Sequence, residues 1–293
     1  MMPDANMLGL IPDAKEDPSG KSSAELVVER SPTGLLSESY RQVRTAVLSK
    51  MDRRGYKTLV CVGAMPQSGT STVVQNLATS LAFNGRSVLI IDANFRRPSQ
   101  HRLMDVSNDL GLVDVLKDRQ DFESVVHQHP DTSLSVLTTG QAVDAPPELL
   151  EGASFRGMLG QLEATYDLIL IDAPPALLTS DSQLLSKHVD AIAAVVRAGS
   201  DKRGMLNRML QQLDGQRADV LGVILSGVQS AAGGYFRKSY EEFYKYRQAE
   251  SLPGKRASRG GKSKSAKRRG KTTNGSHAAE ALAESSETEA SSR

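Results

Sequence analysis

Lys57-Thr-Leu-Val-Cys-Val-Gly63 runs directly into Ala64-Met-Pro-Gln-Ser-Gly-Thr-Ser-Thr72, and a helical pattern follows. The first segment is short and apolar with no polar alternation, which is typical of a strand in a parallel sheet covered on both faces. The second contains Pro66 and Gly69, the residues that most often mark a turn. Together they predict a strand, a tight turn and a helix, which is the repeating unit of α/β proteins.

The same alternation continues along the chain. Apolar runs predict strands at 58–63, 87–92, 134–137, 167–172, 191–197 and 220–225. Helical periodicity predicts helices at about 36–50, 71–84, 111–118, 155–164, 180–187 and 202–213. Strands that alternate with helices imply right-handed crossovers, so we expect an α/β fold with a mostly parallel sheet and helices on both faces. In such sheets ligands bind at the carboxyl ends of the strands.

Composition divides the chain into three parts. With 39% hydrophobic and 24% charged residues, the chain as a whole resembles a folded globular protein. Residues 251–293, however, hold ten Lys or Arg and four Glu, and the run 255–271 has nine basic residues and no acid. We expect a flexible N-terminal arm at 1–33, a folded domain at 34–250, and a disordered tail at 251–293, basic at first and then rich in Ala, Ser and Glu.

Several classes of protein and site are excluded by what the sequence lacks. A single cysteine, Cys61, rules out a disulfide framework or a cysteine-rich zinc site, and its apolar neighbours predict a buried thiol. Four of the five histidines have no partners at metal-ligand spacing and are expected on the surface or in loops; they are His101, His127, His129 and His188. No stretch is apolar enough to span a membrane and no signal peptide precedes the domain, so we expect a cytoplasmic protein.

Residues 64–72 match much of the phosphate-binding loop pattern G-x-x-x-x-G-K-[ST]. Ala64 takes the position of the first glycine and Thr70 that of the lysine. In such a loop, backbone N–H groups and a helix N-terminus cradle phosphates. The residues expected to bind the nucleotide are Gln67, Ser68, Gly69, Thr70, Ser71 and Thr72. Taken alone, the match is equally compatible with a plain connection between a strand and a helix.

Two aspartates strengthen the nucleotide interpretation. Leu89-Ile-Ile-Asp92 and Leu168-Ile-Leu-Ile-Asp172 each end an apolar strand, so both carboxylates should lie beside the loop that follows the first strand. A buried carboxylate is costly unless it meets a cation. We therefore expect Mg²⁺ bound by Ser71, Asp92 and Asp172 together with nucleotide phosphates. An aspartate that merely caps a turn would explain one of these residues, but not their coincidence.

Several sequence motifs, and their order along residues 7–246, resemble those of the bacterial P-loop tyrosine kinases that control capsule and exopolysaccharide synthesis. The motifs are Glu38-x-x-Arg41-x-x-Arg44, Asp92-Ala-Asn-Phe-Arg-Arg-Pro98, Gly140 with Pro147-Glu-Leu-Leu150, and Tyr166-Asp-Leu-Ile-Leu-Ile-Asp172-Ala-Pro-Pro175. The resemblance implies that ATP and Mg²⁺ are the cofactors and that Asp92 and Asp172 serve catalysis. It also implies that Glu38, Arg41 and Arg44 pack against a neighbouring subunit in a ring.

The resemblance extends to both ends of the domain. Four of the seven tyrosines lie within twelve residues and are similar to the family's phosphorylated cluster; they are Tyr235, Tyr240, Tyr244 and Tyr246. An amphipathic helix packed on the body would also place aromatic residues there.

Met7-Leu-Gly-Leu-Ile-Pro12 is similar to the segment after the second membrane helix of one-piece members. We therefore expect one of two arrangements. Either the true N-terminus of the protein lies upstream, or the chain is the cytoplasmic half of a system whose membrane part is a separate protein. The latter would be held at the inner face of the plasma membrane by a membrane-embedded adaptor of the polysaccharide copolymerase type.

Two positions depart from the family pattern. Thr70 replaces the lysine that would neutralise phosphate charge, and loss of one such stabilising group typically costs about 10²–10³ in rate. Asn94 replaces the second aspartate of the D-A-D-L-R-R-P segment and is a poorer metal ligand. Arg96, Arg97 or an arginine of a neighbouring subunit are candidates for restoring the missing charge.

Three functions follow from these observations. The first is an ATP-dependent tyrosine kinase that phosphorylates its own tail between subunits, with activity impaired by Thr70. The second is a nucleotide-binding pseudokinase scaffold that regulates polysaccharide machinery without transferring phosphate. The third is a partitioning-type ATPase, which would use the basic run 255–271 for sequence-independent, salt-sensitive binding to nucleic acid or anionic lipid. Under the other two functions, the run either stays solvated or binds anionic lipid or nucleic acid weakly and without specificity. The third leaves the tyrosine cluster and the Glu38 helix unexplained.

Overall fold

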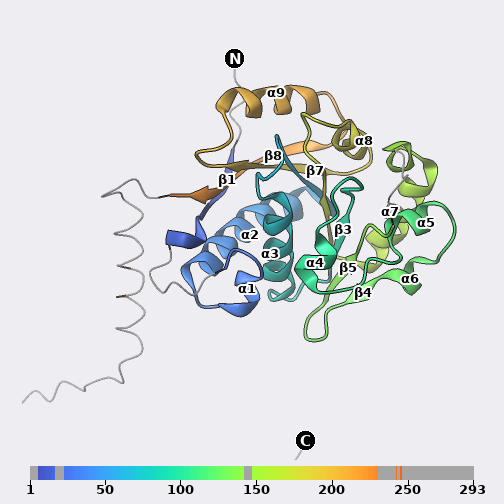
Figure 1. Cartoon of the computed structure of the whole chain (residues 1–293), viewed down its shortest axis with the longest axis horizontal. Helices are drawn as coiled ribbons and strands as arrows, with labels where there is room; N and C mark the ends of the chain where they lie inside the picture. The colour runs from blue at the N-terminus through green and yellow to red at the C-terminus, as the bar shows by residue number, and fades with distance from the viewer. Residues whose placement is uncertain (1–5, 17–22, 142–146, 230–241, 243–244, 246–293) are drawn as a thin grey trace, which may run out of the picture. The chain divides into compact units, whose positions relative to one another are not determined.

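The apolar strands of the computed structural model form one eight-stranded sheet, in the order β1-β8-β7-β2-β6-β3-β5-β4 (Figure 1). Among the described residues, each neighbouring pair is parallel except β4 and β5. The strands are β1 (Met7–Pro12), β2 (Thr58–Gly63), β3 (Val88–Asp92), β4 (His127–Gln128), β5 (Leu134–Leu137), β6 (Leu168–Asp172), β7 (Ala191–Arg197) and β8 (Asp219–Val228). The carboxyl ends of β2, β6 and β3 therefore lie side by side at one edge of the sheet.

Helices follow the strands in the alternation that the sequence predicts. They are α1 (Val27–Arg30), α2 (Leu35–Arg54), α3 (Thr70–Ala82), α4 (Gln100–Met104), α5 (Leu112–Leu116), α6 (Phe122–Val125), α7 (Ala153–Thr165), α8 (Asp181–Ser186) and α9 (Arg203–Leu213), with the 3₁₀-helices η1 (Ala14–Glu16) and η2 (Pro147–Leu150). Figure 1 shows α2 and α3 on one side of β7 and β8 and α9 on the other. The predicted mostly parallel α/β fold with helices on both faces is confirmed.

Each face of the sheet carries its own apolar core because successive strand residues point to opposite sides. In β2, Leu59 and Cys61 pack against α2 and α3, whereas Val60 and Val62 join the cluster that includes α7 and α9. Cys61 is fully buried, as predicted, and burial followed by the nearby charge of Asp172 raises the pKa of its thiol. With both faces covered, the sheet edge at the strand ends is left for ligand binding.

The structure describes residues 6–16, 23–141, 147–229, 242 and 245. No helix among them combines the length and the apolar character of a membrane span. The tyrosines 235, 240, 244 and 246 and the tail 251–293 lie outside the described residues, so the predictions made for them stay predictions.

Two regions differ from the sequence expectations. Met7–Pro12 lies within the predicted arm at 1–33 but forms edge strand β1, because Leu8 and Ile11 are buried and the backbone pairs with β8. His188, expected on the surface or in a loop, lies in the turn after α8 but is buried, and its ring lies 6.0 Å from that of Phe155 in an edge-to-face arrangement. The burial of β1 and of His188 depends on contacts with distant parts of the chain, which a short local pattern does not reveal.

Candidate functional site

The loop between β2 and α3 turns through two residues with left-handed backbone angles. Gln67 has φ 68° and Gly69, which precedes the first residue of α3, has φ 86°. The close approach that the pattern assigns to its first glycine occurs one residue earlier, at Gly63. A Cβ at Gly63 would lie 2.8 Å from both Ser68 Cβ and Thr70 Oγ1. The Thr70 hydroxyl therefore sits against the end of β2, and this loop folds tightly although residue 64 is alanine.

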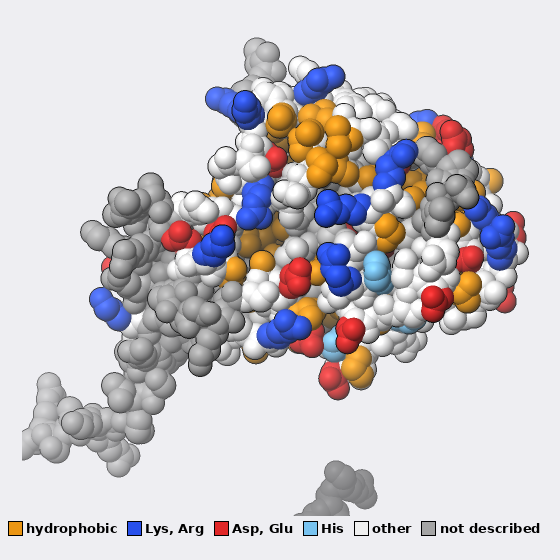
Figure 2. All heavy atoms as spheres, in the orientation of Figure 1, with side chains coloured by type: hydrophobic (Ala, Val, Ile, Leu, Met, Phe, Trp, Pro, Cys, Tyr) orange, Lys and Arg blue, Asp and Glu red, His pale blue; other side chains and the backbone are white. Residues whose placement is uncertain are grey.

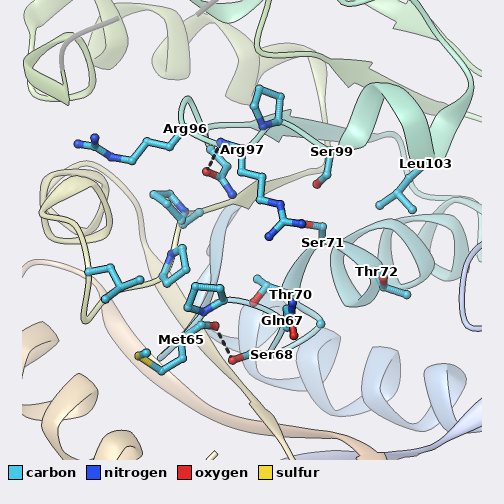
Figure 3. Close-up of a pocket in the computed structure, with 18 of the residues that line it drawn as sticks. Met65, Gln67, Ser68, Thr70, Ser71, Thr72, Arg96, Arg97, Ser99 and Leu103 are labelled. Carbon is cyan, nitrogen blue, oxygen red and sulfur yellow. Dashed lines mark hydrogen bonds between the residues drawn. The ribbon is translucent and has the colours of Figure 1, made fainter. Parts of the chain in front are cut away.

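The outer side of the loop is fixed by polar contacts to the ends of β7 and β8. Ser68 Oγ lies 2.8 Å from the Met65 carbonyl and 2.9 Å from Asp201 Oδ2, and the Ser226 hydroxyl donates to the Ser68 carbonyl at 2.9 Å. The Ser68 side chain is buried among these contacts and points to Met65 (Figure 3). Of the predicted nucleotide-binding residues, Ser68 can therefore offer phosphate only its backbone N–H.

A cavity of about 570 Å³ opens in front of this loop. Its floor and one wall are residues 65–72, including Gln67, Thr70, Ser71 and Thr72, and the opposite wall comes from the segments after β3 and β6. Small-molecule sites usually enclose about 300–1,000 Å³, so the cavity is large enough for a nucleotide. Among the described residues that line it, three are arginines and one is acidic; these are Arg96, Arg97, Arg102 and Glu25. Seen from the face in Figure 2, Lys and Arg side chains gather across the middle of the molecule.

Asp92 lies at the end of β3 directly opposite Asp172 of β6 in the sheet register. Asp92 is fully buried and accepts three backbone N–H groups: from Asn94 at 3.2 Å, Ser99 at 2.8 Å and Gln100 at 2.9 Å. Burial raises the pKa of this carboxyl, and the three N–H groups oppose that rise. Asp92 thus holds the β3–α4 turn and the start of α4 in place.

Asp172 has a different set of partners. Its Oδ2 accepts the Gln100 side-chain amide at 2.8 Å, and the same amide nitrogen lies 3.1 Å from the Ser71 carbonyl. Its Oδ1, also buried, has no hydrogen-bond partner among the described residues. Burial, and then the charge of Asp92, raise the pKa of Asp172, while the nearby Ser71 and Ser99 hydroxyls and the Gln100 amide favour its charged form. Gln100 therefore links the carboxylate to the phosphate-binding loop.

This arrangement fits a magnesium ion better at Asp172 than at Asp92. The Oδ1 of Asp172 is a buried carboxylate oxygen without a hydrogen-bond partner among the described residues, and the Ser71 hydroxyl is close to the same carboxyl group. Carboxylate and hydroxyl oxygens are both ligands that Mg²⁺ accepts. The oxygens of Asp92 are already engaged by backbone donors. In the described part of the chain, no three His, Cys, Asp or Glu side chains form a metal cluster, so nucleotide phosphates and water would have to complete the coordination.

Three comparisons with known proteins agree on the family. A family model described as an AAA domain matches residues 66–196. The tyrosine-protein kinase YwqD of Bacillus subtilis is 29% identical over 73% of this chain and 90% of its own length. A putative tyrosine-protein kinase EpsB of Ralstonia solanacearum is 30% identical over 80% of this chain and 32% of its own length. The solved kinase domain of the Escherichia coli tyrosine kinase ETK has a TM-score of 0.71 and 28% identity, over 79% of this chain and 94% of that domain.

The chain belongs to the bacterial P-loop tyrosine kinase family. It spans most of the Bacillus relative but about a third of the Ralstonia one.

The Glu38-x-x-Arg41-x-x-Arg44 motif of α2 makes contacts within its own chain. Arg41 pairs with Glu38 at 2.6 Å and also donates to the Pro32 carbonyl, and Arg44 donates to the Ser80 carbonyl of α3 at 3.0 Å. Glu38 and Arg41 keep about a third of their side-chain surface exposed. Arg44 is thus partly used to hold α2 on α3, and a role for Glu38, Arg41 and Arg44 between subunits stays a prediction.

Sequence reasoning missed three residues that build this candidate site. Gln100 lies in the five-residue helix α4, which is too short for a periodic signal, although Ser99 after Pro98 is a typical residue before a helix. Gly63 lies outside the strict loop pattern. Asp201 belongs to a segment far along the chain and meets Ser68 only through the parallel sheet. Only the first of these had a signal in the local sequence.

Proposed function

We propose that this chain is a tyrosine-kinase-like regulator that binds Mg²⁺–ATP in the cavity before α3 and transfers phosphate slowly. The observation that carries the proposal is the junction of Ser71, Gln100 and Asp172. It combines a carboxylate oxygen that has no partner in the described part of the chain with a phosphate-binding loop. Family relatives named as tyrosine kinases support the same assignment.

The residues divide the work of binding among them. The turn at Gly69 and the start of α3 would hold phosphates through backbone N–H groups, and Ser71 and Asp172 would hold the ion. Bound Mg²⁺ supplies charge neutralisation at the phosphates. In transfer, the acceptor hydroxyl bonds to the γ-phosphorus, the bond to the bridging oxygen of ADP breaks, and the hydroxyl proton is released.

Impaired transfer is proposed because the loop lacks its cation. The Thr70 hydroxyl lies against Gly63 and carries no charge, so it cannot replace a lysine at the β- and γ-phosphates. The second candidate, a nucleotide-binding pseudokinase scaffold, rests on the same observation and differs only in having no transfer at all.

Phosphotyrosine formation separates the two candidates. The full chain, Thr70→Lys and Thr70→Lys with Asp172→Ala would be incubated with Mg²⁺–ATP and probed with an anti-phosphotyrosine antibody. We expect a faint signal from the unmodified chain, a rise of about tenfold or more in Thr70→Lys, and loss in the double variant. No signal in any variant would favour the scaffold, and a strong signal that Thr70→Lys leaves unchanged would contradict impairment.

The partners are proposed from family membership. We propose that the acceptors are the tyrosines at 235, 240, 244 and 246 of a neighbouring subunit. The assembly would be a ring attached to a membrane-embedded adaptor of the polysaccharide copolymerase type. Cross-linking of the full chain with and without Glu38→Ala tests the ring, because the variant should shift the products towards monomer.

A further inference from the structure

We infer that Arg97 supplies the positive charge that binds the nucleotide phosphates in place of the missing lysine. The inference rests on the proposed function, because it assigns a further residue to the same nucleotide site. It makes the arginine on the wall facing the loop, and not a residue of the loop itself, the main cation of the site.

The first observation is the direction of the side chain. Arg97 follows β3, and its guanidinium extends across the cavity towards Ser71 at the start of α3 (Figure 3). Ser71 is the loop residue placed to share an ion with Asp172, so a charge beside it lies where phosphates would bind. In the phosphate-binding loop pattern, a lysine at position 70 serves the same phosphates.

The second observation is that the Arg97 charge is not engaged elsewhere. Its guanidinium makes no hydrogen bond or ion pair with the residues that the structure describes. The side chain is exposed and therefore accessible to a ligand. A guanidinium presents a planar fork of donors that matches phosphate oxygens in pairs. Arg97 is therefore a cation available for an anionic ligand.

The third observation is that the backbone carrying Arg97 is held firmly. The Arg97 N–H donates to Asn94 Oδ1 at 3.1 Å, and the turn on either side is fixed by N–H groups bound to Asp92. Asn94, the second departure from the family pattern, thus acts as a hydrogen-bond acceptor inside this turn. A fixed backbone lowers the conformational cost of placing the arginine on a ligand.

The adjacent arginine provides a contrast. Arg96 extends away from the loop (Figure 3), and its Nε lies 3.7 Å from Oδ2 of buried Asp181. Burial raises the pKa of Asp181, and Arg96 is the nearby charge that opposes the rise. Arg96 and Arg97 thus have equal charge and neighbouring positions, but only Arg97 faces the loop.

The test measures the dissociation constant of a fluorescent ATP analogue with Mg²⁺ for the full chain and four variants. These are Arg97→Gln, Arg97→Lys, Arg96→Gln, and Arg97→Gln combined with Thr70→Lys. We expect Arg97→Gln to weaken binding about ten- to a hundredfold, the range for a lost charge-assisted hydrogen bond, and Arg97→Lys to weaken it less. Arg96→Gln should change it by less than about threefold, and adding Thr70→Lys should restore much of the loss.

The outcomes distinguish this inference from the proposed function. If the unmodified chain binds and Arg97→Gln binds equally well, or Arg96→Gln loses as much, the role of Arg97 is overturned while the nucleotide site stands. If the unmodified chain does not bind the analogue, both fail. Melting temperatures of the variants, measured in parallel, show whether a loss of binding is a loss of folding.

Discussion

Asp92 and Asp172 end two neighbouring strands with nearly the same sequence, yet the structure gives them different surroundings. Asp92 accepts three backbone N–H groups from the turn that follows it. Asp172 accepts one side-chain amide and keeps one oxygen without a partner among the described residues. Strand sequence therefore places a carboxylate at the sheet edge, and the following loop decides what that carboxylate does.

The loops differ because only one of them turns back over its strand. After β3, the chain returns through Pro98 and begins α4 directly above Asp92, which brings two amides of that helix start onto the carboxylate. After β6, the chain passes Pro174 and Pro175 and the Ala176 N–H donates to the carbonyl of Gly63 at the end of β2. In the part of the chain that the structure describes, no backbone N–H donates to the Asp172 carboxylate. Because Asp172 Oδ1 accepts no hydrogen bond from the described residues, this end of the sheet is suitable for binding an ion.

The largest expected effect is at Asp172. Replacing it with alanine removes the carboxylate beside Ser71, and we expect Mg²⁺-dependent ATP binding to weaken by about a hundredfold or more, because a charged ligand of the ion is lost. Calorimetric titration measures this. Retention of the full Mg²⁺ dependence in the variant would show that Asp172 does not hold the ion.

Replacing Asp92 should lower the stability of the fold more than it weakens ion binding. Asp92→Ala leaves buried amides at the start of α4 without acceptors, and we expect about 2–4 kcal/mol less free energy of unfolding. Urea denaturation of the full chain tests this, with the Mg²⁺ dependence of ATP binding measured on the folded variant. An unchanged stability with lost Mg²⁺ dependence would reverse the roles assigned to the two aspartates.

Gln100 should have an intermediate effect because it links the two carboxylate regions. Gln100→Leu removes the donor to Asp172 and the contact to the Ser71 carbonyl, so we expect Mg²⁺–ATP affinity to fall by about tenfold through loss of orientation. The control is Gln120→Leu, an exposed glutamine outside the cavity. Equal affinity in the two variants would remove Gln100 from the site.

The smallest expected effect lies far from the aspartates, at His188. Burial, and then the charge of Arg156, lower the pKa of His188 in the folded chain, so the unfolded chain takes up a proton first as pH falls below about 6.5. Stability should therefore fall between pH 6.5 and the lower folded pKa. Urea unfolding at pH 7.5 and pH 5.5 should show a smaller decrease for His188→Phe. An identical decrease in both proteins would mean that other groups cause it.

The strands and the longer helices could be predicted from the sequence because their signals are local. Apolar runs placed β2, β5 and β7 at their observed bounds and the other predicted strands within about three residues, as expected when core burial decides the backbone. Strand β1 was missed because Gly9 interrupts its pattern and its partner β8 lies at the other end of the domain.

The site was only partly predictable. Family motifs and the sheet-edge rule located residues 67–72, Asp92 and Asp172 in one region, which the structure brings together through Gln100. The division of roles between the aspartates, and between Arg96 and Arg97, depends on side-chain directions set by the turn after β3. Such directions arise from tertiary contacts, so no spacing in the sequence encodes them.

Calorimetric titration of the unmodified full chain with ATP, once in excess Mg²⁺ and once in EDTA, tests the central claim most directly. If Ser71 and Asp172 complete an ion site at the phosphate-binding loop, saturable heat will appear with Mg²⁺ and weaken at least about tenfold in EDTA. No saturable heat at millimolar ATP, or equal affinity in both buffers, would contradict the account.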